Sequence, residues 1–131
     1  MSVNILTIDD SKMVRIMIGR AFKDLDCKLL EAANGQEGLE IARRDRPDLI
    51  LLDYTMPVMD GLDTMTVIQA DAELRSIPVI MLTAEGSKDI RLRLAQLGVR
   101  DYLVKPFKDD VLIERVSRVV PLSKTAVAQA A

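Results

Sequence analysis

Histidine is absent from this sequence of 131 residues, and its absence excludes several kinds of chemistry. The chain itself cannot supply the imidazole of a serine–histidine–aspartate triad, a histidine metal ligand or a phosphohistidine. Cysteine occurs once, as Cys27, so an intrachain disulfide cannot form and there is no Cys/His cluster to bind zinc. A single cysteine fits a reducing, cytoplasmic compartment.

Long apolar runs and an excess of basic residues are also missing. No run approaches the roughly 18 apolar residues of a membrane span. The N-terminal MSVNILTIDD has no basic segment ahead of its short apolar run, so it is unlike a signal peptide. With 18 basic and 20 acidic residues the net charge is −2, which argues against broad phosphate contacts with nucleic acid. We therefore expect a cytoplasmic domain that binds neither membrane nor nucleic acid directly.

Short apolar runs alternate with helical patterns along the chain. Hydrophobic residues make up 49% of the sequence, enough for one domain with a core. The apolar runs are continuous and rich in Val, Ile and Leu, which is typical of parallel strands covered on both faces. The predicted fold is α/β, a doubly wound five-stranded parallel sheet of (βα)5 units. Expected strands are 5–8, 28–32, 49–53, 79–82 and 102–104, and expected helices are 11–25, 36–45, 62–72, 88–97 and 108–119.

Local signals mark the ends of the predicted elements and of the domain. Ser11 is placed to cap the first helix, and Gly98 follows the fourth helix where a left-handed backbone ends many helices. Residues 121–131 are alanine-rich and weakly patterned. We expect a domain over residues 1–120, followed by a flexible tail or the start of a linker.

Acidic, hydroxyl and ammonium side chains follow four of the five predicted strands. Each alone is explained by an ordinary turn or helix cap. Together they meet at the carboxyl edge of the sheet, where doubly wound folds bind ligands. Three carboxylates there repel one another unless a cation joins them, and Mg²⁺ prefers such oxygens together with phosphate. A lysine and a hydroxyl beside them suit a phosphoryl group. The residues are Asp9, Asp10, Asp53, Thr83 and Lys105.

Four motifs carry a family resemblance, in an order and spacing that are more specific than any motif alone. The chain resembles the receiver domain of two-component response regulators over about residues 3–120. The resemblance implies the flavodoxin-like strand order 2-1-3-4-5, for which a member of this family is a known example. The motifs are IDDSKMVR (8–15), LILLDYTMPVMDG (49–61), PVIMLTA (78–84) and DYLVKPF (101–107).

The resemblance implies a phosphoacceptor and a metal site. Asp53 would attack a phosphoryl group carried by a histidine kinase or a histidine phosphotransfer protein, giving an aspartyl phosphate. Asp10 and Asp53 would hold Mg²⁺ or Mn²⁺, with Asp9 joining directly or through water. The backbone carbonyl of Thr55 would supply another oxygen. Metal and lysine cancel the repulsion between carboxylate and phosphate and leave in-line positioning as the remaining task.

The resemblance also implies phosphate ligands and a switch. Lys105 would pair with Asp53 at rest and with the phosphoryl group after transfer, beside a cis Lys105–Pro106 peptide. The Thr83 hydroxyl and the Ala84 N–H would bind phosphoryl oxygens, and Tyr102 would swing inward as Thr83 moves. A downstream partner would then read the surface of helix 88–97, strand 102–104 and helix 108–119. Arg91, Arg93 and Arg100 lie on or beside that surface.

Other functions on a similar fold fit the residues less well. A phosphatase of the haloacid dehalogenase type needs a second Asp two residues after its nucleophile, but Asp53 is followed by Tyr54 and Thr55. A flavin module needs a Ser/Thr/Gly-rich phosphate loop after the first strand, where this chain has two acids. We expect no turnover of a separate substrate, only self-phosphorylation and slow hydrolysis tuned by Thr55 and Glu85. We expect a single-domain regulator, with the N-terminal receiver of a larger DNA-binding or enzymatic regulator as the alternative.

Overall fold

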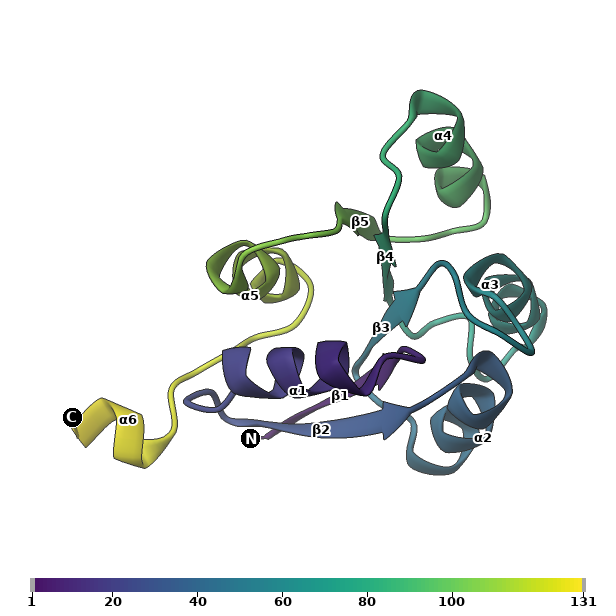
Figure 1. The fold of residues 1–131 in the computed structure, drawn as a ribbon. Coiled ribbons are helices and arrows are strands. Elements are labelled where there is room, and N and C mark those ends of the chain that lie inside the picture. The colour runs from purple at the N-terminus through teal and green to yellow at the C-terminus, as the bar shows by residue number, and fades with distance from the viewer. Residues whose placement is uncertain (1, 131) are drawn as a thin grey trace.

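The structure is a computed structural model that describes residues 2–130, and its centre is a five-stranded parallel sheet (Figure 1). The sheet order is β2-β1-β3-β4-β5, so both the predicted doubly wound sheet and its order are confirmed. The strands are β1 (Val3–Ile8), β2 (Cys27–Ala32), β3 (Leu49–Asp53), β4 (Val79–Thr83) and β5 (Asp101–Val104).

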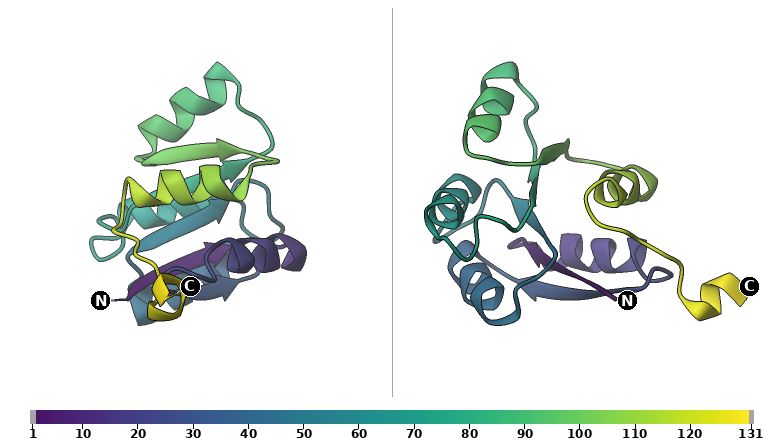
Figure 2. Two further views of the ribbon diagram at one scale, coloured as in Figure 1. Left: turned by 90° about the vertical axis from the view of Figure 1, so that its left-hand side faces the viewer. Right: turned by 180° about the vertical axis from the view of Figure 1, so that it is seen from behind.

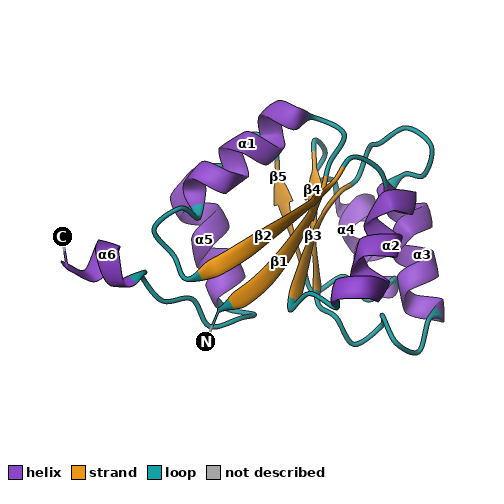
Figure 3. Ribbon diagram, turned by 90° about the horizontal axis from the view of Figure 1, so that it is seen from below, coloured by secondary structure: helices purple, strands orange, loops and turns teal. Residues whose placement is uncertain are grey.

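Helices cover both faces of the sheet, as Figure 3 shows from below and Figure 2 from the side and from behind. α1 (Lys12–Ala21) and α5 (Asp109–Ser117) lie on one face. α2 (Gly35–Asp45), α3 (Gly61–Ala70) and α4 (Lys88–Gln96) lie on the other. A short α6 (Ala126–Ala130) projects beyond α1 at the end of the described chain.

Each face of the sheet has its own hydrophobic core, because successive side chains of a strand point to opposite faces. The α1/α5 core contains Leu49 and Leu51 of β3, packed with Ile18 and Leu112. The α2–α4 core contains the intervening residues Ile50 and Leu52, packed with side chains of α2, α3 and α4. Burial on both faces explains why β3 is a continuous apolar run in the sequence.

The local signals at Ser11 and Gly98 agree with the structure, whereas the predicted end of the first helix does not. The Ser11 hydroxyl accepts a hydrogen bond from the Val14 N–H, and Gly98 has a φ of +85° after α4. α1 ends at Ala21, whereas the apolar pattern predicts a helix that continues to residue 25. The apolar pattern continues past the helix because Phe22 and Leu25 pack in the same α1/α5 core from a turn.

The segment after α5 makes backbone contacts with the turn between α1 and β2. The Asp26 N–H donates to the Ser123 carbonyl at 2.7 Å and the Thr125 N–H donates to the Asp24 carbonyl at 2.9 Å. Leu25 and Lys124 form an antiparallel bridge. These bonds hold residues 123–125 against the domain. The expectation that residues 121–131 form a flexible tail or the start of a linker stays a prediction.

The apolar runs of the sequence are too short to predict a membrane span. Within residues 2–130, none of the helices combines the length and apolar character that a transmembrane span requires.

Candidate functional site

Strand alternation brings two of the predicted acids to the same face of the sheet. Leu49 and Leu51 of β3 lie in the α1/α5 core, and Asp53 continues that alternation at the end of the strand. Ile5 of β1 lies in the same core, and Asp9 follows it two alternations later. Because β1 and β3 pair with Ile5 opposite Leu49, Asp9 comes opposite Asp53 just beyond the paired residues.

The lysine after β5 reaches both of these carboxylates. Lys105 Nζ lies 3.0 Å from Asp53 Oδ1 and 3.2 Å from Asp9 Oδ2. Asp9 and Asp53 are buried, whereas Asp10 is exposed at the mouth of the site. The Lys105–Pro106 peptide is cis, as the resemblance implied. The resting pair of Asp53 and Lys105 that the resemblance implied is therefore present in the structure, with Asp9 as an additional partner.

Burial and charge shift the pKa of both members of this pair. Burial raises the pKa of Asp53, and repulsion from Asp9 raises it further. The Lys105 ammonium and the Thr55 N–H lower it in part. Burial alone would lower the pKa of Lys105, but its hydrogen bond to Asp53 and the charges of Asp9 and Asp53 raise it. A buried carboxylate with a raised pKa carries negative charge that one lysine does not fully compensate.

Three carboxylates converge closely enough to share one cation. One oxygen each from Asp9, Asp10 and Asp53 lies within 4.8 Å of the others. Oxygen-only donors in this number suit Mg²⁺ or Mn²⁺, which keep water and phosphate oxygens as further ligands. The uncompensated charge at Asp53 gives a physical reason for a divalent ion there. The residues fit the predicted metal, and the ion itself remains a prediction.

The loop after β3 holds Asp53 from the carboxyl side. The Thr55 N–H lowers the pKa of the Asp53 carboxyl, and the Thr55 carbonyl is the predicted metal ligand. The Asp60 side chain accepts a hydrogen bond from the Asp63 N–H and caps α3. A Cβ on Gly61 would lie 2.6 Å from the Asp53 carbonyl oxygen, so only glycine allows this close approach. Gly61 therefore shapes this loop for a steric reason.

The predicted switch residues lie on the other side of the sheet's edge. Thr83 ends β4, and its hydroxyl accepts from the Glu85 N–H at 3.1 Å and donates to the Glu85 carbonyl at 3.0 Å. Ala84 follows it and is exposed. Tyr102 is half-buried and packs against the α2–α4 core, on the face where α4 lies. The Thr83 hydroxyl is therefore bonded within its own loop here, and its role toward phosphate stays a prediction.

One residue with a close contact to the acidic cluster was not identified from the sequence. An Nη1–H of Arg15 donates to the Asp9 backbone carbonyl, and its Nε–H donates to Glu31 at 3.0 Å. The Asp9 carboxylate also accepts the Ser11 N–H at 2.9 Å. Arg15 follows Val14, which packs against the α1/α5 core, so a charged side chain beside that face of α1 was the available signal.

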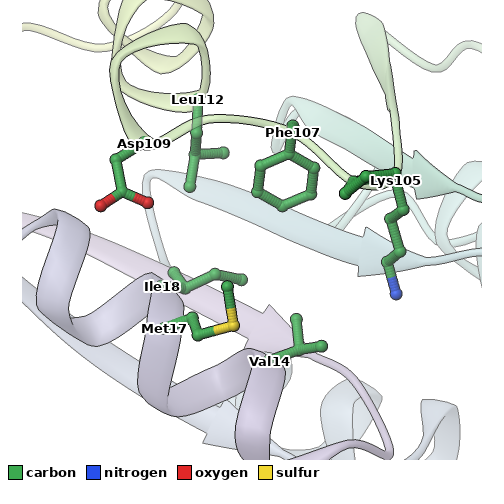
Figure 4. Close-up of a pocket in the computed structure, with 8 residues that line it drawn as sticks. Val14, Met17, Ile18, Lys105, Phe107, Asp109 and Leu112 are labelled. Carbon is green, nitrogen blue, oxygen red and sulfur yellow. The ribbon is translucent and has the colours of Figure 1, made fainter.

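An apolar groove of about 400 Å³ adjoins the acidic cluster between α1 and α5 (Figure 4). Met17 and Val14 of α1 face Phe107 and Leu112 across it, and the stem of Lys105 lines the end next to the carboxylates. Large apolar side chains of α1 are also exposed. They are Met13 at 66%, Ile16 at 40% and Met17 at 50% of full exposure. Met17 belongs to this exposed set and also lines the groove.

Comparisons with known proteins match the chain over nearly its whole length. The sequence pattern of the response regulator receiver domain matches residues 5–117. Chemotaxis protein CheY of Pseudomonas aeruginosa is 35% identical over 118 residues, which are 89% of this chain and 95% of that protein. Sporulation initiation phosphotransferase F of Bacillus subtilis is 34% identical over 122 residues, 93% of this chain and 97% of that protein. The solved structure of chemotaxis protein CheY4 of Vibrio cholerae has a TM-score of 0.86 at 31% identity, covering 92% of this chain and 100% of that one.

Proposed function

This chain belongs to the response regulator receiver domain family, and we propose that it accepts a phosphoryl group on Asp53 from a phosphohistidine of a partner protein. The family implies a histidine kinase or phosphotransfer partner and a downstream target. The observation that carries the assignment to Asp53 is its position. It is a buried carboxylate at a strand end, within reach of Lys105 Nζ and beside the carboxylates of Asp9 and Asp10.

The proposed reaction is a transfer between two nucleophiles. An Asp53 carboxylate oxygen forms a bond to phosphorus while the bond from phosphorus to the donor's imidazole nitrogen breaks. The electron pair stays on that nitrogen, which takes up a proton. A divalent cation held by Asp9, Asp10 and Asp53, with the Thr55 carbonyl, would neutralise charge on the transferring phosphoryl group. The cation is Mg²⁺ or Mn²⁺ by the chemistry of these donors.

Besides the proposed metal ion, Lys105 supplies positive charge to the site from the chain's own side chains. At rest its Nζ bridges Asp9 and Asp53 at 3.2 and 3.0 Å, and this pairing keeps its pKa raised and the side chain charged. When Asp53 carries the phosphoryl group, the same ammonium is close enough to pair with a phosphoryl oxygen. Thr83 and the Ala84 N–H, at the end of the neighbouring strand, would bind the other oxygens.

Release of the Thr83 hydroxyl from Glu85 is the proposed start of the switch. The two bonds to Glu85 tie Thr83 to the loop before α4, so a Thr83 that turns to phosphate must break them. Space then opens on the α4 side, where Tyr102 is half-buried. The surface of α4, β5 and α5 changes as a result, and a downstream partner reads it. Arg91, Arg93 and Arg100 are exposed there.

The groove between α1 and α5 is the surface that we assign to the phosphodonor protein. A protein that delivers a phosphoryl group to Asp53 must cover the rim of the site, and the groove is continuous with Lys105 at that rim. Exposed Met13, Ile16 and Met17 add apolar area, which marks interaction sites on otherwise soluble surfaces. We propose no separate substrate turnover, only self-phosphorylation from a donor and slow hydrolysis.

Labelling with a small phosphodonor tests the assignment. Wild-type protein incubated with phosphoramidate and Mg²⁺ should gain the mass of one phosphoryl group, and a chelator should prevent it. Asp53→Asn should abolish the gain because the nucleophile is lost. Asp63→Asn, which removes an exposed acid in the first turn of α3, is the matched control and should label normally. Labelling that survives Asp53→Asn would overturn the assignment.

A further inference from the structure

We propose that Arg15 is a positioning residue that fixes the Asp9–Asp10 peptide so that the Asp10 carboxylate is aimed for cation binding; this inference rests on the proposed function. The Arg15 guanidinium donates to the Asp9 carbonyl, the oxygen of the peptide that joins the two aspartates. Its Nε–H donates to Glu31 of β2 at 3.0 Å. One side chain of α1 thereby connects the end of β1 to the neighbouring strand.

The backbone around Asp10 is held on both sides. Before it, the Asp9 N–H donates to the Ala32 carbonyl at 3.0 Å, and the Asp9 carbonyl accepts from Arg15. After it, the Ser11 N–H donates to the Asp9 carboxylate at 2.9 Å. Asp10 itself is exposed, so its carboxylate is directed mainly by the peptides that flank it. Arg15 is the only side chain from another element that bonds to these peptides among the hydrogen bonds of the described residues.

Arg15 is itself held in one orientation. Its side chain is 15% exposed, although the side chain of its partner Glu31 is 57% exposed. Two separate N–H groups of the planar guanidinium serve two acceptors, and both bonds are charge-assisted. A lysine carries a single ammonium on a flexible stem and lacks this fixed fork. The identity of the residue as arginine therefore matters to the geometry and not only to the charge.

Charge and geometry predict opposite effects when Arg15 is removed. A positive charge near a cation site repels the cation, so loss of charge alone would strengthen metal binding. If Arg15 positions Asp10, its loss frees the Asp9–Asp10 peptide and weakens metal binding. The sign of the change therefore separates a positioning role from a simple field effect.

Mn²⁺ binding to the unphosphorylated protein tests this proposal without the transfer reaction. Free Mn²⁺ can be measured by electron paramagnetic resonance for wild type, Arg15→Met, Arg15→Lys and Glu31→Gln. We expect Arg15→Met to weaken Mn²⁺ binding about tenfold, the lower end of the range for groups that orient metal ligands. Arg15→Lys should weaken Mn²⁺ binding by less than Arg15→Met does. Glu31→Gln keeps an acceptor for Arg15 and should weaken Mn²⁺ binding the least. Arg20→Met removes an exposed charge from the last turn of the same helix and should not weaken binding.

The phosphodonor reaction supplies a second readout. Phosphoramidate labelling of Arg15→Met should need more Mg²⁺ for half-maximal rate and should recover most of the wild-type rate at saturating Mg²⁺. Unchanged or tighter Mn²⁺ binding by Arg15→Met and Arg15→Lys would overturn the positioning role, even with normal labelling of wild type. Should Arg15→Met fail to fold, Arg15→Lys keeps the charge and decides the question alone. Absence of labelling in the wild type would instead count against the proposed function.

Discussion

Asp53 is the residue in which fold and chemistry conflict most directly. The carboxylate ends a fully buried strand, so the protein holds a charge where water is largely excluded. Its pKa is raised by burial and by Asp9, and Lys105 offsets only part of the cost. Such a site is less stable than an apolar one but better prepared to bind a cation and a phosphoryl group.

This conflict predicts the effect of removing the charge. Between the usual and the raised pKa of Asp53, the folded state binds more protons than the unfolded state. Stability contributed at this site therefore falls as pH rises through that range. Asp53→Asn removes the loss, while Lys105 keeps Asp9 as its partner. At neutral pH without metal, we expect the free energy of unfolding of Asp53→Asn to exceed that of wild type by about 1 kcal/mol. This value is close to the repulsion of two charges about 4 Å apart in water.

Urea unfolding at several pH values measures this difference. The advantage of Asp53→Asn over wild type should grow as pH rises from the ordinary aspartate pKa toward the raised pKa of Asp53, because the wild type loses stability over that interval. Added Mg²⁺ should reduce the advantage by stabilising the wild type. An Asp63→Asn control should show no such trend, since its carboxylate is exposed. A variant less stable than wild type at pH 7 would contradict the expectation.

The loop from β3 to α3 is the element that holds this acid in place. Gly61 begins α3 with its Cα against the backbone of Asp53 and Tyr54, where a Cβ would lie 2.6 Å from the Asp53 carbonyl oxygen and 2.8 Å from the Tyr54 Cα. Backbone atoms cannot move aside as a flexible side chain can. The helix start and the strand end are therefore fixed relative to one another by the absence of a side chain.

Two glycine-to-alanine substitutions test this steric account. Gly61→Ala should lower the free energy of unfolding by about 2 kcal/mol through overpacking, and slow the labelling of Asp53 by displacing it. Gly19→Ala is the matched control inside α1, where the nearest atom to the new Cβ is Leu29 Cδ1 at 3.9 Å, an ordinary contact. That change should raise stability by about 0.5–1 kcal/mol because alanine favours a helix over glycine. Equal effects of the two substitutions in thermal and urea unfolding would count against the close approach.

Across the whole molecule, the proposed function assigns different tasks to the two faces of the sheet. On the α1/α5 side lie Asp53, Asp9 and Lys105 together with the apolar groove that we assign to the phosphodonor. On the other side, Thr83 and Tyr102 lie toward α4. A domain with this arrangement can receive the phosphoryl group on one surface and present the changed surface elsewhere.

A charge placed in the groove should separate protein donors from small donors. With a histidine kinase that phosphorylates the wild-type chain, Met17→Glu should lower kcat/KM for transfer about tenfold or more, as expected for an apolar contact at an interface centre. Labelling by phosphoramidate should stay close to wild type, because Met17 lies outside the acidic cluster. Val127→Glu, at an 82% exposed position in α6, serves as the control. Equal transfer to the Met17→Glu and Val127→Glu proteins would rule out the groove as the donor surface.

Much of the fold could be predicted because strands and helices report their burial locally. The apolar run of β3, the cap at Ser11 and the turn at Gly98 each follow from neighbouring residues, and the structure agrees with them. The end of α1 could not be predicted in the same way. Its apolar pattern continues into Leu25, which packs from a turn that residues 123–125 cover, and that contact joins distant parts of the chain.

By itself, the sequence determined the parallel sheet and the acids, hydroxyl and lysine at its strand ends, because continuous apolar runs and motif order are local properties. The roles of those residues remain predictions. Only the tertiary structure decided that Lys105 bridges Asp9 as well as Asp53, and that Arg15 contacts both the Asp9 carbonyl and Glu31. These contacts depend on strand register and on how each helix sits on the sheet. Both are set by packing between segments far apart in the chain, which no local pattern records.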